Sequence, residues 1–507
     1  MPNATEPVAL PSPSLPSKKP LLLPLALLAV ATFLAIYLTM PSSFQIRWND
    51  ETLYFTVAKN IYFEGDFNSH HYLSESLLRK GYPTKDTHPP GYPLLMATSF
   101  LFFGVGETAA YLQNYSLLFA TLLLLFFMGR ELGNATTGLG AALLFLVNPL
   151  TLSLTQSIMS EISAALAVTW VCFVLLMIED GYLKGLLLAV GIALATLIKP
   201  FLLVLIPACF LFFWIHPGEF RSRSILALTV SFALLAGFVV FPLSSNREYY
   251  PSSINDLFLQ PSAKAKLQYA MKNFVKNFRL SKALPWKSGE LAVLLFGFAY
   301  LLLPFAALIR RKRLPWTGLY AAVAFAFSTT LLAVFFIYEY PAWRGSRAIF
   351  AFFPVLALLG GIGLTRLRPA ALGAVFALGL GAINLYYAKS SFDVLEKSKL
   401  RQSAILNQYA NRTDKNLARY GLQPKVLLST NNLYLAVGRY PVKIILSEPR
   451  TLADFAKIEA LLPPDALELR PGGPLFQANL RLNGEARFGS NYELAGQGDG
   501  FYYYRRR

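Results

Sequence analysis

The sequence is poor in charge. Charged residues make up 15% of the 507 residues, against about 25% in a soluble globular protein. Apolar residues make up 55%, and they gather into runs of about 20 residues that recur through the first three quarters of the chain. This composition excludes a soluble enzyme, a disordered chain and a fibrous protein, and it indicates a polytopic α-helical membrane protein.

Cysteine is almost missing. The two cysteines, Cys172 and Cys209, both lie inside apolar runs, so neither a disulfide framework nor a thiolate metal site is indicated. We also find no Gly-rich phosphate-binding motif and no internal repeat of solenoid length. The net charge of +18 is better explained by membrane sidedness and anionic lipids than by nucleic acid, which we do not expect as a partner.

The apolar runs predict about 11 membrane spans. The first, 21–40, follows a tail (1–20) whose Lys18 and Lys19 place the N-terminus in the cytoplasm. No small-residue cleavage site follows it, so it is expected to be a retained helix. The other spans are expected at 109–128, 138–152, 162–178, 185–198, 201–215, 224–242, 290–309, 315–337, 347–364 and 369–387. An odd number of spans places the C-terminus outside, as in a bacterial inner-membrane protein.

The stretch Gly91–Phe103 is apolar but too short to cross a bilayer, so we expect a re-entrant or interfacial helix on the outer face. It belongs to the outer loop 41–108. A second outer loop, 243–289, is rich in lysine. Between Pro261 and Gly289 it carries only basic charges, with apolar residues at helical spacing. This pattern predicts a helix on the membrane surface that contacts lipid headgroups or gathers an anionic glycolipid.

The polar tail that follows the membrane domain (21–387) predicts a small extracytoplasmic α/β domain at 388–507. KVLLST (425–430) and VKIILS (442–447) have the pattern of strands. Leu452–Leu462 is typical of an amphipathic helix, and YELAGQGDGFYYY (492–504) of a hairpin around a Gly-rich turn.

Three carboxylates at the outer surface are candidate catalytic groups. Asp50 and Glu51 are adjacent and lie about ten residues beyond the first span, where one could accept a proton as a general base. Glu161 opens a later span at the same surface. The alternatives are a solvated loop for the pair and an ordinary helix start for Glu161.

These motifs resemble the GT-C glycosyltransferases that use lipid-linked sugars. The nearest branch is that of the protein O-mannosyltransferases and the lipid A aminoarabinose transferases. The shared features are the Asp50-Glu51 pair, the Pro-Pro segment that closes the first loop, the acidic opening of an outward helix pair, and Leu197-Ile198-Lys199-Pro200. The resemblance implies a GT-C fold over about residues 20–390, with Asp50 as the base and Glu51 beside it. Tyr54 and His88 would line the same site.

Three cations on the outer side are candidate contacts for the donor phosphate. Lys199 interrupts two apolar helices, and Arg344 and Arg347 break the positive-inside pattern. Guanidinium groups bind phosphate oxygens in two-point contacts, and the resemblance implies this role for Lys199 and Arg347. Snorkelling of Lys199 and an ion pair of Arg347 with Glu339 are the alternatives.

A divalent metal is a further hypothesis for the first outer loop. Three of the four histidines, His70, His71 and His88, share it, and hydrogen-bonding histidines are the alternative. The branch with aminoarabinose donors has an acidic residue and a lysine where this chain has Thr87 and His88. The metal dependence of that branch therefore does not carry over directly.

Together these features predict an inverting transfer of a sugar from a polyprenyl phosphate to an acceptor hydroxyl outside the membrane. The acceptor is left open among a glycolipid, a polysaccharide and a protein. A polysaccharide polymerase or ligase is the nearest alternative. A flippase or transporter of lipid-linked saccharides would show paired repeats with broken helices at mid-membrane, and a non-catalytic scaffold would leave the outward lysine and arginines without a role.

Overall fold

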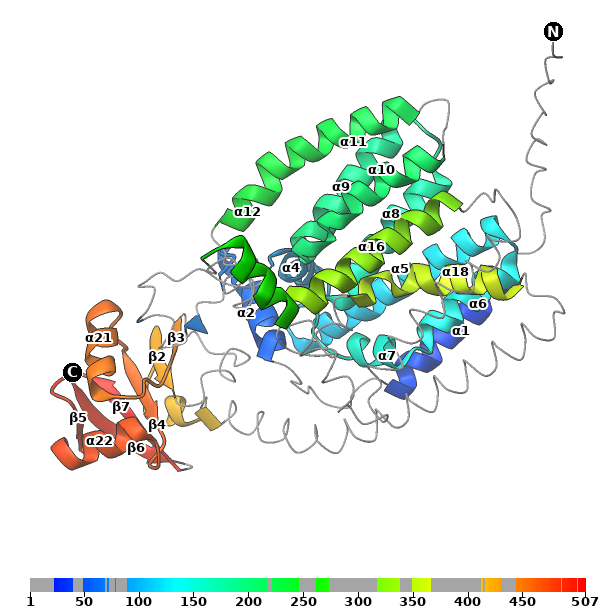
Figure 1. Ribbon diagram of the computed structural model, residues 1–507. Coiled ribbons are helices and arrows are strands. Elements are labelled where there is room, and N and C mark those ends of the chain that lie inside the picture. The colour runs from blue at the N-terminus through cyan, green and yellow to red at the C-terminus, as the bar shows by residue number, and fades with distance from the viewer. Residues whose placement is uncertain are drawn as a thin grey trace, which may run out of the picture.

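The computed structural model consists of a helical part and a mixed β-sheet with its own helices (Figure 1). The residues that it describes are 22–39, 49–68, 71–72, 78, 89–216, 221–245, 261–272, 317–337, 349–365, 412–413, 415–429, 444–484, 486–498 and 500–507.

The helical part accounts for most of these residues. Its elements are α1 (Leu22–Thr39), α2 (Asn49–Glu64), α4 (Gly91–Phe103), α5 (Glu107–Leu132), α6 (Ala135–Leu146), α7 (Pro149–Thr155), α8 (Glu161–Met177), α9 (Tyr182–Ile198), the 3-10 helix η1 (Pro200–Val204), α10 (Leu205–Ile215), α11 (Arg221–Leu235), the π-helical turn η2 (Ala236–Val240), α12 (Phe241–Ser245), α16 (Thr317–Ile337), the 3-10 helix η3 (Phe350–Phe352) and α18 (Phe353–Thr365).

Helices occupy every expected span that falls within the described residues. Two of the helices, Thr108–Leu132 and Arg221–Leu243, are long and apolar enough to cross a membrane on their own, and eight shorter apolar helices accompany them. The span expected at 138–152 is instead two helices, because Asn148 caps α7 by accepting a hydrogen bond from the Leu150 amide and Pro149 opens that helix. The spans expected at 290–309 and 369–387 lie outside the described residues, so the number of 11 stays a prediction.

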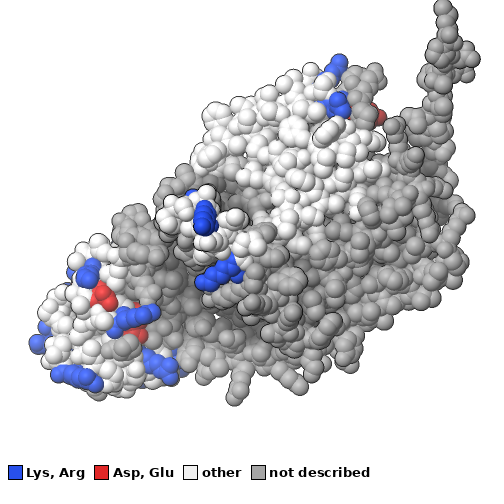
Figure 2. All heavy atoms as spheres, viewed as in Figure 1, with Lys and Arg blue, Asp and Glu red and all other residues white. Residues whose placement is uncertain are grey.

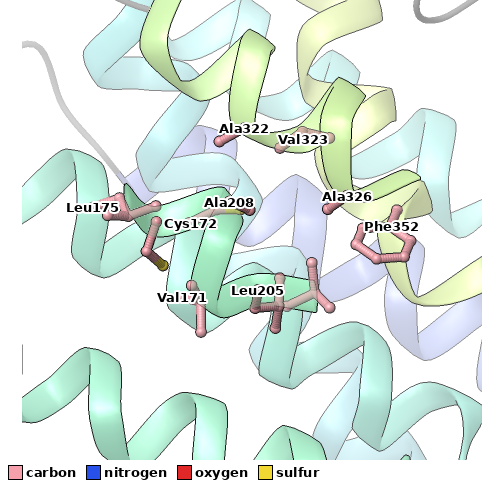
Figure 3. A pocket seen from close by; sticks show the side chains of 11 residues that line it. Val171, Cys172, Leu175, Leu205, Ala208, Ala322, Val323, Ala326 and Phe352 are labelled. Carbon is pink, nitrogen blue, oxygen red and sulfur yellow. The ribbon is translucent and has the colours of Figure 1, made fainter. Parts of the chain in front are cut away.

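One apolar core joins the long helices. Buried side chains of α1, α5, α6, α8, α9, α10, α16 and α18 form a single cluster. Between α8, α10, α16 and η3 a small, wholly apolar pocket remains, to which Cys172 contributes (Figure 3). The helix Arg221–Leu243 is different: only 11% of an 18-residue apolar stretch in it is buried. Such a continuous exposed apolar surface suits contact with lipid.

The basic second loop is partly described. A helix covers 263–272, which agrees with the first half of the expected surface helix. Leu267 is 64% exposed and Met271 is 44% exposed, and Lys264 is also exposed. The remaining basic residues of this loop, from Lys276 onward, lie outside the described residues.

A seven-stranded sheet with the order β1-β3-β2-β4-β7-β6-β5 forms the second part of the structure. Its strands are β1 (His71–Tyr72), β2 (Val426–Ser429), β3 (Ile444–Ser447), β4 (Ala466–Leu469), β5 (Arg487–Phe488), β6 (Tyr492–Gly498) and β7 (Phe501–Arg506). The first four in spatial order are parallel, and β7, β6 and β5 continue the sheet antiparallel. Helices α21 (Leu452–Leu461) and α22 (Pro474–Asn483) accompany it.

The strands and the helix expected in this region are confirmed at the residue level. β2 and β3 pair in register with Val426 opposite Ile444. α21 begins where Thr451 accepts a hydrogen bond from the Asp454 amide. β6 and β7 form the expected hairpin, closed at Gly500 with φ +80°. The left-handed conformation there favours glycine.

The edge strand β1 comes from the first outer loop and not from the C-terminal region. His71 lies opposite Ile445, and Tyr72 lies opposite Leu446. Leu78, a few residues further along the same loop, packs against the apolar core of the sheet. Figure 1 shows β1 at the edge of the sheet, beside β3. The first outer loop and the C-terminal sheet therefore fold together.

One carboxylate is buried in the C-terminal sheet. Glu468 of β4 accepts hydrogen bonds from Thr413 Oγ1 (2.6 Å), Ser429 Oγ (2.5 Å) and the Tyr503 hydroxyl (3.1 Å). Burial raises the pKa of Glu468 above its usual value, although these hydrogen bonds oppose the shift. The contacts tie the segment around Thr413 to the middle of the sheet.

Candidate active site

The acidic pair opens a helix. The prediction of a loop at this place is wrong, because α2 begins at Asn49 and carries Asp50 and Glu51 in its first turn. Its aromatic side chains pack against α4, which stabilises the helix through tertiary contacts. Glu51 is fully buried, so its side chain is not part of a solvated loop. The side chain of Asp50 lies outside the described residues.

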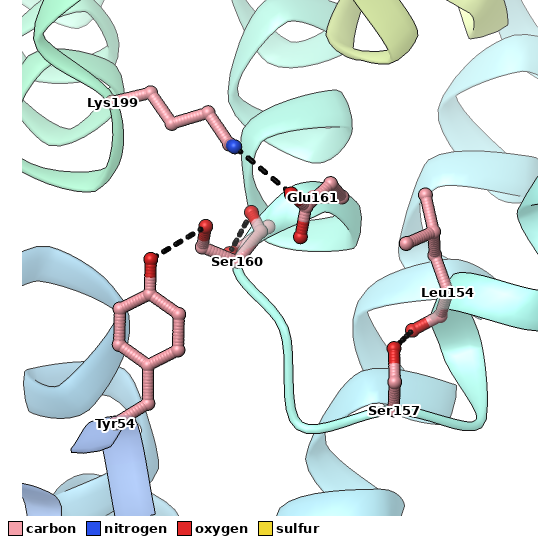
Figure 4. A network of polar contacts seen from close by, with 7 residues as sticks. Tyr54, Leu154, Ser157, Ser160, Glu161 and Lys199 are labelled. Atoms are coloured by element: carbon pink, nitrogen blue, oxygen red, sulfur yellow. Dashed lines mark hydrogen bonds and ion pairs between the residues drawn. The ribbon is translucent and has the colours of Figure 1, made fainter. Parts of the chain in front are cut away.

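Tyr54, one turn after this pair, joins α2 to the start of α8. Its hydroxyl lies 3.3 Å from Ser160 Oγ, directly before Glu161 (Figure 4). Its ring packs edge-on against Tyr92 of α4, with centroids 5.2 Å apart. The expected role of Tyr54 in lining the site stays a prediction.

Tyr92 and Asn114 extend the polar cluster to α5. The Tyr92 hydroxyl donates to Asn114 Oδ1 at 3.1 Å, and Asn114 Nδ2 donates to the Ser157 carbonyl. All of these side chains are buried. A buried polar network whose members are hydrogen-bonded fixes the relative positions of the helices that carry it.

Gly91 brings α4 against the end of α9. A Cβ atom at this position would lie 2.6 Å from the Leu197 carbonyl carbon and 2.7 Å from the Ile198 amide nitrogen. Only glycine permits this backbone approach. The Pro-Pro-Gly-Tyr segment thus sets the start of α4 beside the residue that follows α9, which is Lys199.

Lys199 and Glu161 form an ion pair. The Lys199 Nζ lies 3.1 Å from Glu161 Oε1, as Figure 4 shows. The Glu161 side chain is fully buried, and that of Lys199 is 14% exposed. Lys199 also lies 5.9 Å from the centre of the Phe201 ring. The sequence had marked these two residues separately, and the packing of α8 on α9 brings them together.

Two carboxylates act on Tyr92. Burial raises the pKa of the Tyr92 hydroxyl well above its usual value, and the charges of Glu51 and Glu161 raise it further. Glu161 begins α8 and Lys199 directly follows α9, so this cluster lies at the ends of two apolar helices.

The structure brings four of the expected residues, Glu51, Tyr54, Glu161 and Lys199, into one cluster. Arg344, Arg347 and His88 lie outside the described residues. Sequence reasoning missed Tyr92, Asn114 and Ser160. Asn114 could have been found, because a polar amide inside an apolar helix requires a hydrogen-bond partner.

The described residues contain no group of three or more histidine, cysteine, aspartate or glutamate side chains suited to a metal ion. The side chains of Asp50, His71 and His88 lie outside the described residues. A metal at this site therefore stays a prediction, and no step below depends on one.

The family comparison covers part of the chain. Residues 87–243 match the model of the family described as dolichyl-phosphate-mannose-protein mannosyltransferase. This match and the fold together confirm the resemblance to GT-C glycosyltransferases of membranes. The matched stretch includes Gly91, Tyr92, Glu161 and Lys199, which are the residues that bring α4, α8 and α9 together.

Solved structures share the fold over almost the whole chain. ArnT from Cupriavidus metallidurans in the apo state is similar with a TM-score of 0.56 and 14% identity, over 95% of this chain and 97% of that one. ArnT of the same organism bound to undecaprenyl phosphate gives a TM-score of 0.51 and 12% identity over the same shares. Arabinofuranosyltransferase AftD from Mycobacteria gives 0.54 and 14%, over 95% of this chain and 40% of that one. No curated protein sequence matches the chain.

Proposed function

We propose that the protein transfers a sugar from a polyprenyl phosphate to an acceptor hydroxyl on the outer face of the membrane, with inversion at the anomeric carbon. The observation that carries this proposal is the contact of α2 with the start of α8, through Tyr54 and Ser160, directly beside the Glu161–Lys199 pair. Acidic groups and a cation thereby meet at one end of an apolar helix bundle. A lipid-linked substrate needs this arrangement, because its chain is apolar and its reacting end is charged.

Lys199 is the proposed contact for the donor phosphate. Its ammonium is held at the end of α9 by Glu161 and keeps 14% of the side chain exposed, so it can receive a second anion. Stabilising the charge that grows on the leaving phosphate is the main electrostatic contribution to such a transfer. The similar fold of ArnT bound to undecaprenyl phosphate supports a polyprenyl carrier here. Arg344 and Arg347 are proposed to bind the same phosphate.

Asp50 is the proposed base. It would take the proton of the acceptor hydroxyl while the hydroxyl oxygen attacks the anomeric carbon and the bond to the phosphate oxygen breaks. Glu51, the next residue, is buried beside Tyr92 and is better suited to fixing the start of α2 than to meeting an acceptor. A single displacement of this kind inverts the configuration.

The pairing of β1 with β3 supports a common side for the site and the C-terminal sheet. Two strands can pair only on one side of a membrane, so an even number of crossings separates residues 72 and 444. Adding the first span gives an odd total number of crossings, so the two ends of the chain lie on opposite sides of the membrane. This agrees with an N-terminus in the cytoplasm and a C-terminal domain (388–507) outside. We propose that this domain covers the site and takes part in acceptor binding.

The test compares Asp50→Asn and Glu51→Gln in purified protein supplied with a polyprenyl-phosphate sugar. Asp50→Asn keeps the size of the side chain but cannot accept a proton, so turnover should fall about 10²–10⁴-fold. Glu51→Gln should reduce turnover less, and its thermal stability must be measured alongside because Glu51 is buried.

A matched control is Asp66→Asn, which removes a carboxylate from the turn after α2, where Asp66 Oδ1 accepts a hydrogen bond from the Asn68 amide. Turnover of this variant should stay near that of the unchanged protein. A selective loss in Glu51→Gln would move the base by one residue. Full activity in both Asp50→Asn and Glu51→Gln would refute the proposed site.

A further inference from the structure

At the end of α9 remote from Lys199, α9 and α11 run parallel in close contact. The Gly181 amide donates to Ser224 Oγ at 2.8 Å. A Cβ atom at Gly185, one turn on, would lie 2.7 Å from the Leu228 amide nitrogen. The two helices therefore begin together, and their amino ends point the same way.

A groove runs along the outer side of this contact. It has a volume of about 450 Å³ and is lined by Tyr182, Leu183 and Leu186 from α9 and by Leu226, Ala227 and Val230 from α11. Apart from Ser231 its walls are apolar, and they face outward, with Tyr182 60% and Leu226 56% exposed.

Arg223 lies at the entrance of the groove. Its guanidinium carbon is 6.0 Å from the centre of the Tyr182 ring. On α11, Arg223 heads the stripe Leu226, Val230 and Leu234, which lie at helical spacing on one face. A cation above an apolar stripe matches a lipid, whose charged headgroup precedes an apolar chain.

The charges around this entrance favour an anion. Asp180 is neutralised by Lys184, whose Nζ lies 2.8 Å away. Of the other described charged residues beside it, Glu179 is acidic and Arg221 and Arg223 are basic. The amino ends of α9 and α11 add partial positive charge. Figure 2 shows basic side chains at the end of the helical part where α11 begins, above a surface along α11 without charge.

The groove and the candidate active site lie at opposite ends of one helix. α9 has 17 residues, which at about 1.5 Å per residue separates Tyr182 from Lys199 by about 25 Å. This is most of the hydrocarbon thickness of a bilayer, about 30 Å. A lipid in the groove would therefore belong to the other leaflet from the donor phosphate at Lys199.

We propose that this groove binds an anionic phospholipid of that leaflet, with the headgroup phosphate on Arg223 and one acyl chain between α9 and α11. The groove is thus a lipid site separate from the donor site. The proposal depends on the embedding of the helices in a membrane and not on the transfer reaction.

The experiment reconstitutes the full-length protein in nanodiscs of phosphatidylcholine with a minority of phosphatidylglycerol, and measures retained lipid by native mass spectrometry. Arg223→Gln should weaken phosphatidylglycerol retention about tenfold, because a hydrogen bond to a charged group is lost. Val230→Trp should reduce it similarly by filling the groove. Arg221→Gln is the matched control: it removes the same charge two residues away, but its guanidinium donates to the Phe213 carbonyl.

The site would be supported if Arg223→Gln and Val230→Trp retain less phosphatidylglycerol while Arg221→Gln retains as much as the unchanged protein. An equal loss in both arginine variants would mean that only general attraction to anionic lipid operates, and would overturn the proposal. Unchanged retention in Arg223→Gln would overturn it too. The proposal would also be overturned if the lipid that copurifies with the protein from cells, and that Val230→Trp no longer retains, were a polyprenyl lipid.

Discussion

Replacing Lys199 with Met should strongly destabilise the helical part. At the observed 3.1 Å, the attraction between the Lys199 and Glu161 charges is about 5 kcal/mol at an effective dielectric constant of about 20. Desolvation offsets much of this attraction. Lys199→Met nevertheless leaves a fully buried carboxylate without the cation beside it, and losses of about 3–5 kcal/mol are usual for such a change.

The reverse change should cost less. Glu161→Gln leaves an ammonium on a long, partly exposed side chain that can reach water. The double variant carries neither charge, so its destabilisation should be smaller than the sum of the two single losses. The expected coupling energy is about 2 kcal/mol.

The assay is denaturant unfolding of the purified full-length protein in detergent, followed by tryptophan fluorescence, without donor. Lys199→Met should unfold at the lowest denaturant concentration, Glu161→Gln should follow, and the double variant should lie above Lys199→Met. The view that the two charges stabilise each other would be refuted if the stability losses of the single variants simply add in the double variant. It would also be refuted if Glu161→Gln destabilises the protein more than Lys199→Met.

Three further predictions concern other parts of the chain. Gly91→Ala should destabilise the protein by about 1–3 kcal/mol, because its Cβ atom would meet the Leu197 backbone at 2.6 Å. Thermal unfolding measures this loss. In the same assay the control Gly140→Ala, which has open space around it, should be neutral or stabilising. Arg347→Ala should weaken donor binding by about 1.5–3 kcal/mol, with only partial rescue by Arg347→Lys; equal donor affinity in all three proteins would exclude Arg347 from the site. The raised pKa of Glu468 means that the folded state binds the extra proton, so stability of the sheet should fall as pH rises from the usual glutamate pKa of about 4.3 to the folded pKa and stay level above it. Hydrogen exchange of β4 amides, corrected for intrinsic rates, should show this fall, and Glu468→Gln should abolish it.

Local patterns predicted the regular elements well. Strand-like apolar patterns marked β2 and β3, a Gly-rich turn marked the β6–β7 hairpin, and amphipathic periodicity marked α21. Apolar runs marked the helices of the core. These features were accessible because each depends on neighbours within a few residues in the sequence.

Elements that depend on distant partners were not predictable. α2 has no apolar run and was expected to be a loop; it is helical because Tyr54 and Phe55 find partners on α4 and beyond. β1 has only two residues, and its pairing with β3 has no local signal. The same holds for the site. Glu161 and Lys199 were identified one by one, but their ion pair follows from how α8 packs on α9.

The origin of β1 in the first outer loop also sets an order of events in time. Residue 71 precedes its partner, residue 445, by 445 − 71 = 374 positions. At a synthesis rate of about 5–20 residues per second, roughly 20–75 s pass between the two. Through that interval the backbone of residues 71–72 must be hydrated or paired elsewhere. The pairing of β1 can therefore form only after residue 445 has been made, and a chain released before then would leave residues 71–72 without this partner strand.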